Sequence, residues 1–361
     1  MRKRSFKRKL YLRRVERKRE IRQTKRRRKQ KYLRASKRNP FYRAVKGMKK
    51  FAVLQAPVQF TLSEETHRTE LLTFINQIRY AYRNRIKTKI LFSKVERLHP
   101  DGTLLFVSEM RRILATELGR TLFSCGYPRD TVVEQLFQHI GLLNAFGKNP
   151  RVKITAENVK YWSFSQGTST DELEDLVPVH GSFVESLGEE LAKKLFSGVS
   201  EAITNCLHHA YIQSTNDPTE SLEKGWWLFT HYRDGLLSVA VCDLGIGIPR
   251  SVHVTQSSRW DKFQEYLSKY RTFNYKDVDY IRAAIDMGFT RTRKTHRGKG
   301  LPEMIDVAKK SESGGVRIYS NKGAYNFNSK DKADSTRQFE RSIMGTLILW
   351  TLPVEQLKVG A

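Results

Sequence analysis

The residue types best suited to chemistry lie in three short segments between positions 201 and 301. Residues 201–210 carry a carboxylate and an amide at helical spacing, and residues 243–249 place an aspartate before two glycines. Residues 298–301 form a glycine–lysine–glycine loop. Oxygen ligands suit a hydrated Mg²⁺, and glycine-rich backbone at the start of a helix suits phosphate. Together, the three segments predict a nucleotide pocket.

In residues 201–210, apolar side chains recur at three- and four-residue steps, which predicts a helix with one apolar stripe. Glu201, Asn205 and His208 then share a polar stripe, because residues three and four apart are neighbours on a helix. Glu201 and Asn205 suit a hydrated Mg²⁺ and an attacking water or hydroxyl. An ordinary amphipathic helix with a solvated face would show the same pattern.

The second segment follows a predicted hairpin, with strands at 227–232 and 236–242 around a turn at 233–235. Asp243 ends the second strand, and Gly245 and Gly247 let the backbone approach a ligand closely. A carboxylate at that edge can accept a hydrogen bond from an exocyclic amine such as that of adenine. Taken alone, the pattern also fits a simple turn.

The third segment contains Gly298, Lys299, Gly300 and Leu301, and a helix over 301–308 follows with a proline in its first turn. Amide groups at a helix N-terminus bind phosphate, and Lys299 adds positive charge. A flexible surface loop is the alternative. The spacing differs from the P-loop pattern, which requires Gly-Lys-Ser/Thr.

The order and spacing of these segments resemble the N, G1 and G2 boxes of the GHKL ATPases, the superfamily of gyrase-type topoisomerases, heat-shock chaperones, mismatch-repair ATPases and histidine kinases. The resemblance spans about residues 180–353 and ends in Gly345-Thr346 and a final strand. It implies a Bergerat-type α+β sandwich that binds ATP and Mg²⁺.

By the same resemblance, Asn205 matches the family's magnesium ligand, Asp243 its adenine-reading aspartate, and Glu201 the general base of members that hydrolyse ATP. The loops around the ligand are matched by Gly245, Gly247, Gly298, Gly300 and Leu301. Pro302-Glu303 replaces the family's second Gly-Leu, which puts the speed of turnover in doubt more than binding. Between the G1 and G2 boxes, residues 250–297 match the ATP lid and contain Arg291, Arg293, Lys294 and His296, although a basic surface loop is equally consistent.

The net charge of +29 is concentrated in residues 1–50, where 25 Lys and Arg face only Glu16 and Glu20, leaving +6 for the rest. We expect a helix over about 6–35 that folds on binding, and nucleic acid is the favoured partner of this basic arm. A disordered solubilising tail and attachment to an anionic membrane surface are the alternatives.

Residues 51–147 alternate strands and helices, which predicts an α/β layer. The expected elements are helices at 63–83, 103–118 and 131–141 and strands at 89–92 and 121–124, with a turn at 99–102. The pattern resembles STAS domains, the small α/β modules of anti-sigma-factor antagonists, and implies a module that docks a protein partner or dimerises. Asp101 stands where those antagonists carry a phosphorylatable serine, so a serine switch is not expected there.

Residues 148–182 are expected to be a linker, and 183–355 the nucleotide domain, which a helix from about residue 183 opens. Three scattered cysteines fit small buried hydrophobes in a reducing cytoplasm rather than disulfides or zinc. No run of eighteen apolar residues exists, so we expect no transmembrane segment.

The sequence therefore predicts an ATP-binding protein, with hydrolysis driving a conformational switch. Two alternatives stay open: an anti-sigma-type serine/threonine kinase, and a nucleic-acid-binding regulator that senses nucleotide without hydrolysing it. A homodimer is also possible. No phospho-accepting helix precedes the nucleotide domain, which argues against a conventional sensor kinase.

Overall fold

The computed structural model describes residues 51–169, 172, 187–212, 222, 224–255, 260–270, 273–288 and 300–354. The described residues from Val53 onward belong to one compact unit. Several predicted features lie outside the described residues: the basic arm 1–50, the first residues of the helix expected from 183, the lid residues Arg291, Arg293, Lys294 and His296, and Gly298 with Lys299.

Among the described residues, seven strands form the larger sheet, in the order β11-β10-β9-β12-β8-β7-β6, and all neighbours are antiparallel. The strands are β6 (Trp162–Gly167), β7 (Trp226–Arg233), β8 (Leu236–Asp243), β9 (Gly315–Ser320), β10 (Gly323–Asn328), β11 (Ala333–Gln338) and β12 (Thr346–Pro353). The predicted β7–β8 hairpin is confirmed, and Asp234 and Gly235 turn it with φ of 53° and 74°. The mixture of helices with an antiparallel sheet confirms the α+β class.

Strand β6 is a difference from the sequence prediction, because it lies within residues 148–182, which we expected to be a linker. Its six residues pair with β7 along their whole length and form one edge of the sheet. Only Trp162 of this strand is buried. A mixed polar sequence of this kind lacks the apolar alternation that marks a strand, although it suits an edge position.

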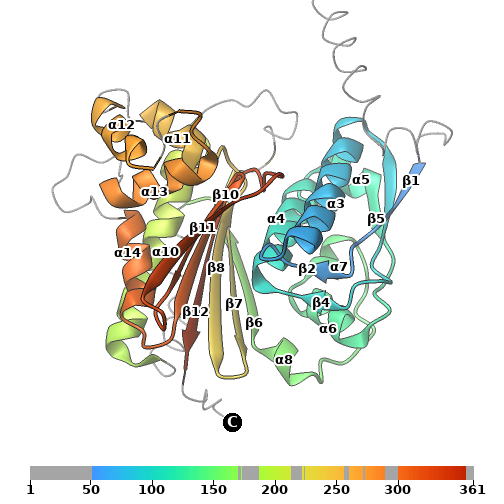
Figure 1. Ribbon diagram of the computed structural model, residues 1–361. Helices are drawn as coiled ribbons and strands as arrows, with labels where there is room; N and C mark the ends of the chain where they lie inside the picture. Colours follow the sequence, from blue (N-terminus) through green and yellow to red (C-terminus); the bar gives the residue numbers. More distant parts are fainter. Residues whose placement is uncertain are drawn as a thin grey trace, which may run out of the picture. The chain divides into compact units, whose positions relative to one another are not determined.

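One face of the sheet is covered by α10 (Glu189–His209) and α14 (Gly300–Lys309), which pack against each other (Figure 1). The helices α11 (Ile248–Thr255), α12 (Trp260–Ser268) and α13 (Asp277–Met287) belong to the same layer. Gly198 of α10 allows the close approach, since a Cβ there would lie 3.0 Å from Val307. The Trp350 indole of β12 donates a 2.7 Å hydrogen bond to the Met304 carbonyl, which fixes α14 on the sheet.

The N-terminal part contains a small sheet of β1 (Phe51–Gln55), β3 (Lys87–Leu91) and β5 (Phe123–Cys125), with β3 parallel to β5. The short strands β2 (Gln59–Phe60) and β4 (Arg97–Leu98) pair separately. The helices are α3 (Glu65–Arg83), α4 (Pro100–Leu114), α5 (Glu117–Leu122), α6 (Thr131–His139), α7 (Leu142–Ala145) and α8 (Glu157–Lys160). Phe60, Phe92, Phe106 and Phe137 pack edge to face at its centre.

Two boundaries in this part differ from the sequence prediction. The turn expected at 99–102 is instead the first turn of α4, because Pro100 occupies the first helical position, where its missing N–H costs nothing. The helix expected over 103–118 ends at Leu114, and Thr116 caps a new helix, α5, through a hydrogen bond from Gly119 N. The following strand consequently starts at Phe123.

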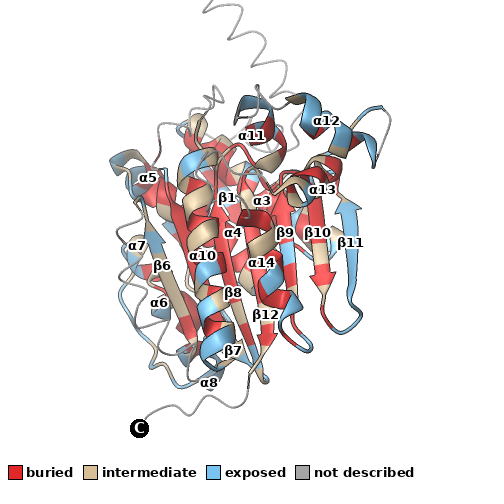
Figure 2. Ribbon diagram, turned by 90° about the vertical axis from the view of Figure 1, so that its left-hand side faces the viewer, coloured by how far each residue is buried: buried red, intermediate tan, exposed pale blue. Residues whose placement is uncertain are grey.

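Helix α4 lies on the second face of the large sheet, where it packs against β7, β8 and β12. Thirteen of its residues are buried, so it is an internal helix and not a surface element. The sheet is therefore covered on both faces, as the continuous buried run Trp226–His231 in β7 reflects (Figure 2). Residues 53–147 and the sheet thus belong to the same compact unit.

Across the described part of the chain, no helix combines the length and apolarity needed to cross a bilayer.

Candidate functional site

The candidate site begins on α10, whose last turns carry the predicted polar stripe. Glu201 and Asn205 are half-buried one turn apart, whereas Ala202, Ile203 and Cys206 are buried against the sheet. The predicted amphipathic helix is therefore confirmed. Glu201 and Asn205 share one face of the helix because positions four apart are neighbours.

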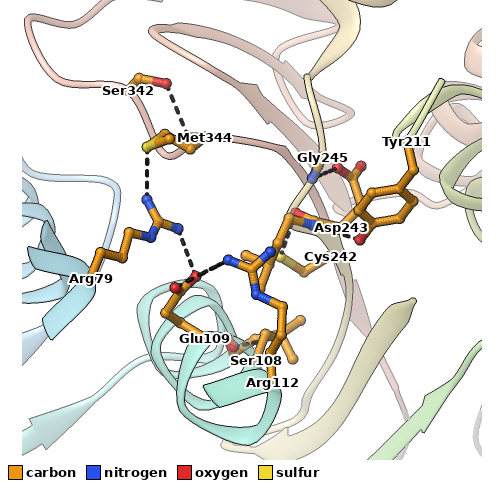
Figure 3. Close-up of polar contacts among 12 residues, drawn as sticks. Arg79, Ser108, Glu109, Arg112, Tyr211, Cys242, Asp243, Gly245, Ser342 and Met344 are labelled. Atoms are coloured by element: carbon orange, nitrogen blue, oxygen red, sulfur yellow. Dashed lines mark hydrogen bonds and ion pairs between the residues drawn. The ribbon is translucent and has the colours of Figure 1, made fainter. Parts of the chain in front are cut away.

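Asp243 is the last residue of β8 and is 4% exposed. Its Oδ1 accepts a 2.8 Å hydrogen bond from Gly245 N, and both the backbone and the hydroxyl of Thr346 donate to the carboxylate (Figure 3). The Cys206 thiol makes a longer contact of 3.9 Å with Oδ2. Burial raises the pKa of Asp243 to about 6, although these hydrogen bonds oppose the shift. The carboxylate is therefore fixed in position and mostly ionised at neutral pH.

The glycines after Asp243 are required by the packing of the chain on itself. A Cβ at Gly245 would lie 2.1 Å from the Ala210 carbonyl, and Ile246 N donates a 2.8 Å hydrogen bond to that same oxygen. Gly247 has φ of 77°, and a Cβ there would lie 2.6 Å from Asn321 Nδ2. We predicted these glycines as points of close approach to a ligand, and the described contacts show close approach to α10 and Asn321.

Asn321 is a site residue that the sequence analysis missed. It has φ of 51°, and its Nδ2 donates a 2.8 Å hydrogen bond to the Ile246 carbonyl. Its backbone N–H donates to the Gly345 carbonyl at 3.0 Å. Asn321 thereby ties the loop after Asp243 to the loop before β12. The signal available in the sequence was Asn321-Lys322-Gly323, a turn pattern between two strands.

Tyr211 is a second missed residue, for which the sequence offered no signal. Its hydroxyl donates a 2.7 Å hydrogen bond to the Gly225 carbonyl and accepts one of 3.2 Å from Leu244 N. Burial raises the pKa of Tyr211 well above its usual range, with the nearby Asp243 carboxylate adding to the shift. The neutral hydroxyl therefore stays in place as a support for the strand end.

The third predicted segment is described from Gly300 onward. Gly300 and Leu301 are buried and start α14, with Pro302 in its first turn as predicted. Figure 1 shows that α10 and β8 end, and α14 begins, at the same end of the sheet. Asp243 and Gly300 therefore lie at this end of the sheet, and Asn205 lies in the last turns of α10, with Glu201 one turn further from the end.

Behind Asp243, on the α4 side of the sheet, lies a buried ion cluster that the sequence did not predict (Figure 3). Glu109 of α4 accepts from Arg79 Nη2 at 2.8 Å and from Arg112 Nη2 at 3.0 Å. Burial alone would raise the pKa of Glu109, but Arg112 and Arg79 outweigh it and lower the pKa to about 2. Glu109 is fully buried, so the cluster is a fixed part of the core.

The ion cluster reaches the loop before β12 through Arg79. Arg79 Nη1 lies 2.9 Å from the sulfur of Met344, whose φ of 57° is unusual for a side chain of this size. The next residue, Gly345, has φ of 141°, and a Cβ there would lie 2.2 Å from the Asp243 carbonyl oxygen. The N-terminal part of the protein thus supports the strand ends that hold Asp243.

Asp101, where no serine switch was expected, lies in the first turn of α4. It is 2% exposed, and its carboxylate accepts hydrogen bonds from Leu62 N and Gly102 N at 3.1 and 2.7 Å. Burial raises its pKa. The side chain therefore serves as a local brace at the start of α4.

All three cysteines are free and buried, which confirms their prediction as small buried hydrophobes. No protein-family model matches the chain, and no curated protein matches it at a significant level.

Proposed function

We propose that this chain is a GHKL-type ATP-binding protein, in which residues 183–355 form a Bergerat-type domain that binds and hydrolyses ATP. The observation that carries the proposal is Asp243, a buried carboxylate held by Gly245 and Thr346 at the end of β8. The end of α10, whose last turns carry Asn205 and Glu201, and the start of α14 lie at the same end of the sheet. These are the groups that adenine, Mg²⁺ and phosphate require.

The Asp243 carboxylate suits an exocyclic amine. A carboxylate offers about four acceptor positions. The contact from the Cys206 thiol to Oδ2 is long, at 3.9 Å, and a thiol is a weak donor, so a stronger donor can replace it. The hydrogen bonds from Gly245 and Thr346 fix the orientation of the carboxylate. An amine that binds there is therefore selected by the direction of its N–H groups as well as by electrostatic attraction.

Glu201 and Asn205 suit the phosphate end of the nucleotide. Mg²⁺ keeps most of its waters and needs only one or two protein oxygens beside the phosphates, which the Asn205 amide oxygen supplies. Glu201 accepts the proton of the attacking water. The backbone amides at the start of α14 attract the negative charge of a phosphate, and Lys299 adds a positive charge. ATP itself supplies the reactive phosphoanhydride bond.

The proposal extends to the other two parts of the chain. The net charge of +23 in residues 1–50 suits a phosphate backbone, so we assign nucleic acid as the partner of the arm. We assign residues 51–147 a STAS-like role, in which α4 couples the nucleotide site to the surface offered to a protein partner. ATP then acts as a conformational switch as well as a substrate.

Phosphate release from Mg-ATP by nuclease-treated protein, with and without added DNA or RNA, tests this function. We expect the turnover of the wild type to rise when nucleic acid is added. In Glu201→Ala it should fall at least about a hundredfold, because general-base catalysis contributes about that much. Glu189→Ala, at the exposed first turn of α10, is the matched control and should retain turnover. Turnover that survives in Glu201→Ala would overturn the role of Glu201.

If ATP binds without release of phosphate, label transfer from ATP to a protein substrate separates the two alternatives. Transfer that depends on Glu201 would identify the serine/threonine kinase. Binding without release or transfer would identify the nucleotide sensor.

A further inference from the structure

A second site lies on the outer face of β9, β10 and β11, away from the face that α14 covers. Opposed residues across these strands form two rows on one face. One row is Arg317, Asn326 and Ser335, and the other is Tyr319, Ala324 and Arg337. Ala324 is small and sits between the larger Tyr319 and Arg337. The result is a hollow of about 300 Å³, which Phe339 and Ser63 close at its edges.

The polar groups lining the hollow are mainly hydrogen-bond donors. Arg317 and Arg337 supply guanidinium groups from β9 and β11, and Ser63 and Ser335 supply hydroxyls. Arg317 Nε donates to Asn326 Oδ1 at 3.3 Å, and the Arg317 side chain also hydrogen-bonds the Tyr319 hydroxyl, so the exposed guanidinium is held at the edge of the hollow by two residues that line it. Guanidinium groups bind phosphate oxygens in pairs of parallel hydrogen bonds, which makes two arginines around a small hollow a strong oxyanion site.

A buried cation also lies beneath the hollow. Arg68 is 0% exposed, and its guanidinium stacks 3.9 Å from the ring centre of Phe339. Its hydrogen bonds to the Leu62 and Arg341 carbonyls are long, at 3.4 Å, and its Nε has no partner among the described residues. Burial lowers the pKa of Arg68 to about 10, although the Asp101 and Glu65 carboxylates oppose the shift, so part of the cost of burying this cation remains.

The described residues that line the hollow include no Asp or Glu, and Glu65 pairs with one of its arginines. Glu65 Oε2 accepts from Arg337 Nη2 at 3.2 Å, and both side chains are substantially exposed. The nearby Asp101 is a second carboxylate; it is buried and accepts hydrogen bonds from two backbone amides and, at 3.5 Å, from the Tyr319 hydroxyl. Arg68, Arg317 and Arg337 therefore exceed the local negative charge, and Glu65 competes with any bound anion for Arg337.

We infer that this hollow is a binding site for a phosphoryl dianion, either free phosphate or a small phosphate monoester, on the face of the sheet opposite the proposed nucleotide site. Arg317 and Arg337 are its principal ligands, and Arg68 contributes charge from below. This site is independent of the proposed ATP activity, since it shares no side chain with Asn205, Glu201 or Asp243.

The test measures binding of inorganic phosphate to the full chain by calorimetry against a chloride background of equal ionic strength. We expect Arg317→Gln and Arg337→Gln each to weaken one binding event at least about tenfold, the contribution of one charge-assisted hydrogen bond. Arg97→Gln, an exposed arginine on β4, removes the same charge elsewhere and should leave that event unchanged. Glu65→Gln should strengthen it severalfold by releasing Arg337.

Hydrogen–deuterium exchange then locates the event. Phosphate should protect peptides covering 63–68, 315–319 and 333–339 in the wild type but not in Arg337→Gln. Equal phosphate binding by all four variants, or protection confined to other peptides, would overturn the site. O-phosphoserine in place of phosphate distinguishes the sources: tighter binding identifies an organic monoester as the ligand, and equal or weaker binding identifies the free ion.

Discussion

At the scale of single residues, two causes explain why a glycine follows Asp243: a positive φ and close contact with a neighbouring side chain. Gly247 has both, whereas Gly147, elsewhere in the chain, has only the first. Gly247 and Gly147 have similar positive φ values, 77° and 71°. A Cβ at Gly247 would lie 2.6 Å from Asn321, whereas a Cβ at Gly147 would meet nothing within 4 Å.

We therefore expect Gly147→Ala to destabilise the fold by about 1 kcal/mol, the cost of strain at positive φ. Gly247→Ala should cost a further ~1–3 kcal/mol from overpacking against Asn321. Chemical denaturation of both variants measures the difference. Equal losses of stability would show that the contact with Asn321 does not constrain this loop.

The raised pKa of Asp243 predicts a pH dependence of stability. The folded-state pKa of about 6 lies above the ordinary value of 3.8, so the folded protein holds this proton more tightly than the unfolded chain. The protonated Asp243 carboxyl therefore contributes to the stability of the fold, and this contribution is fully present below about pH 4. It amounts to about 3 kcal/mol for a pKa shift of about two units, and it is lost as the pH rises through about 6.

Asp243→Asn lacks this titration, while the other ionisable groups are shared with the wild type. The stability of the variant relative to the wild type should therefore improve between pH 4 and pH 7. Urea denaturation at a series of pH values measures this difference. A constant difference would contradict the assignment of the raised pKa to Asp243.

At the scale of elements, the long helices were predicted best, because their apolar stripes extend over several turns. Helices α3 and α14 follow their predicted ranges closely, and α10 contains the predicted helical segment around Glu201. Helices α11, α12 and α13 were not predicted. Strand β6 and helix α5 were missed for different reasons. Strand β6 is a half-exposed edge whose partner lies about sixty residues later in the chain, and α5 depends on a capping hydrogen bond from Gly119 N to Thr116 that a short apolar run does not reveal.

The ion cluster between α3 and α4 predicts a large effect from a single neutralisation. Glu109→Gln leaves Arg79 and Arg112 buried without their carboxylate, which should destabilise the protein by about 3–5 kcal/mol. Asp306→Asn removes one partner of an exposed pair with Lys309 and should cost within about 0.5 kcal/mol. Comparable losses in the two variants would show that the cluster contributes little to the packing of α4 on the sheet.

At the scale of the whole molecule, the position of α4 on the second face of the sheet was not predicted. Periodicity describes one element at a time and does not say which elements meet. The run Trp226–His231 was an available signal, because a strand buried on both faces is apolar without alternation. The candidate residues Glu201, Asn205 and Asp243 were predicted from spacing together with the GHKL resemblance, and their roles stay a prediction. Asn321, Tyr211 and Arg79 could not be predicted, because they act through contacts between distant segments.

The central claim is that Asp243 reads the adenine of a bound nucleotide, and calorimetric titration with Mg-ATP tests it most directly. Asp234→Asn is the matched control, since Asp234 lies in the β7–β8 turn with a side chain that is 79% exposed. We predict that wild type and Asp234→Asn bind ATP alike and prefer it to GTP. Asp243→Asn should bind at least about tenfold more weakly and lose that preference. Undiminished ATP binding by a folded Asp243→Asn protein would contradict the account.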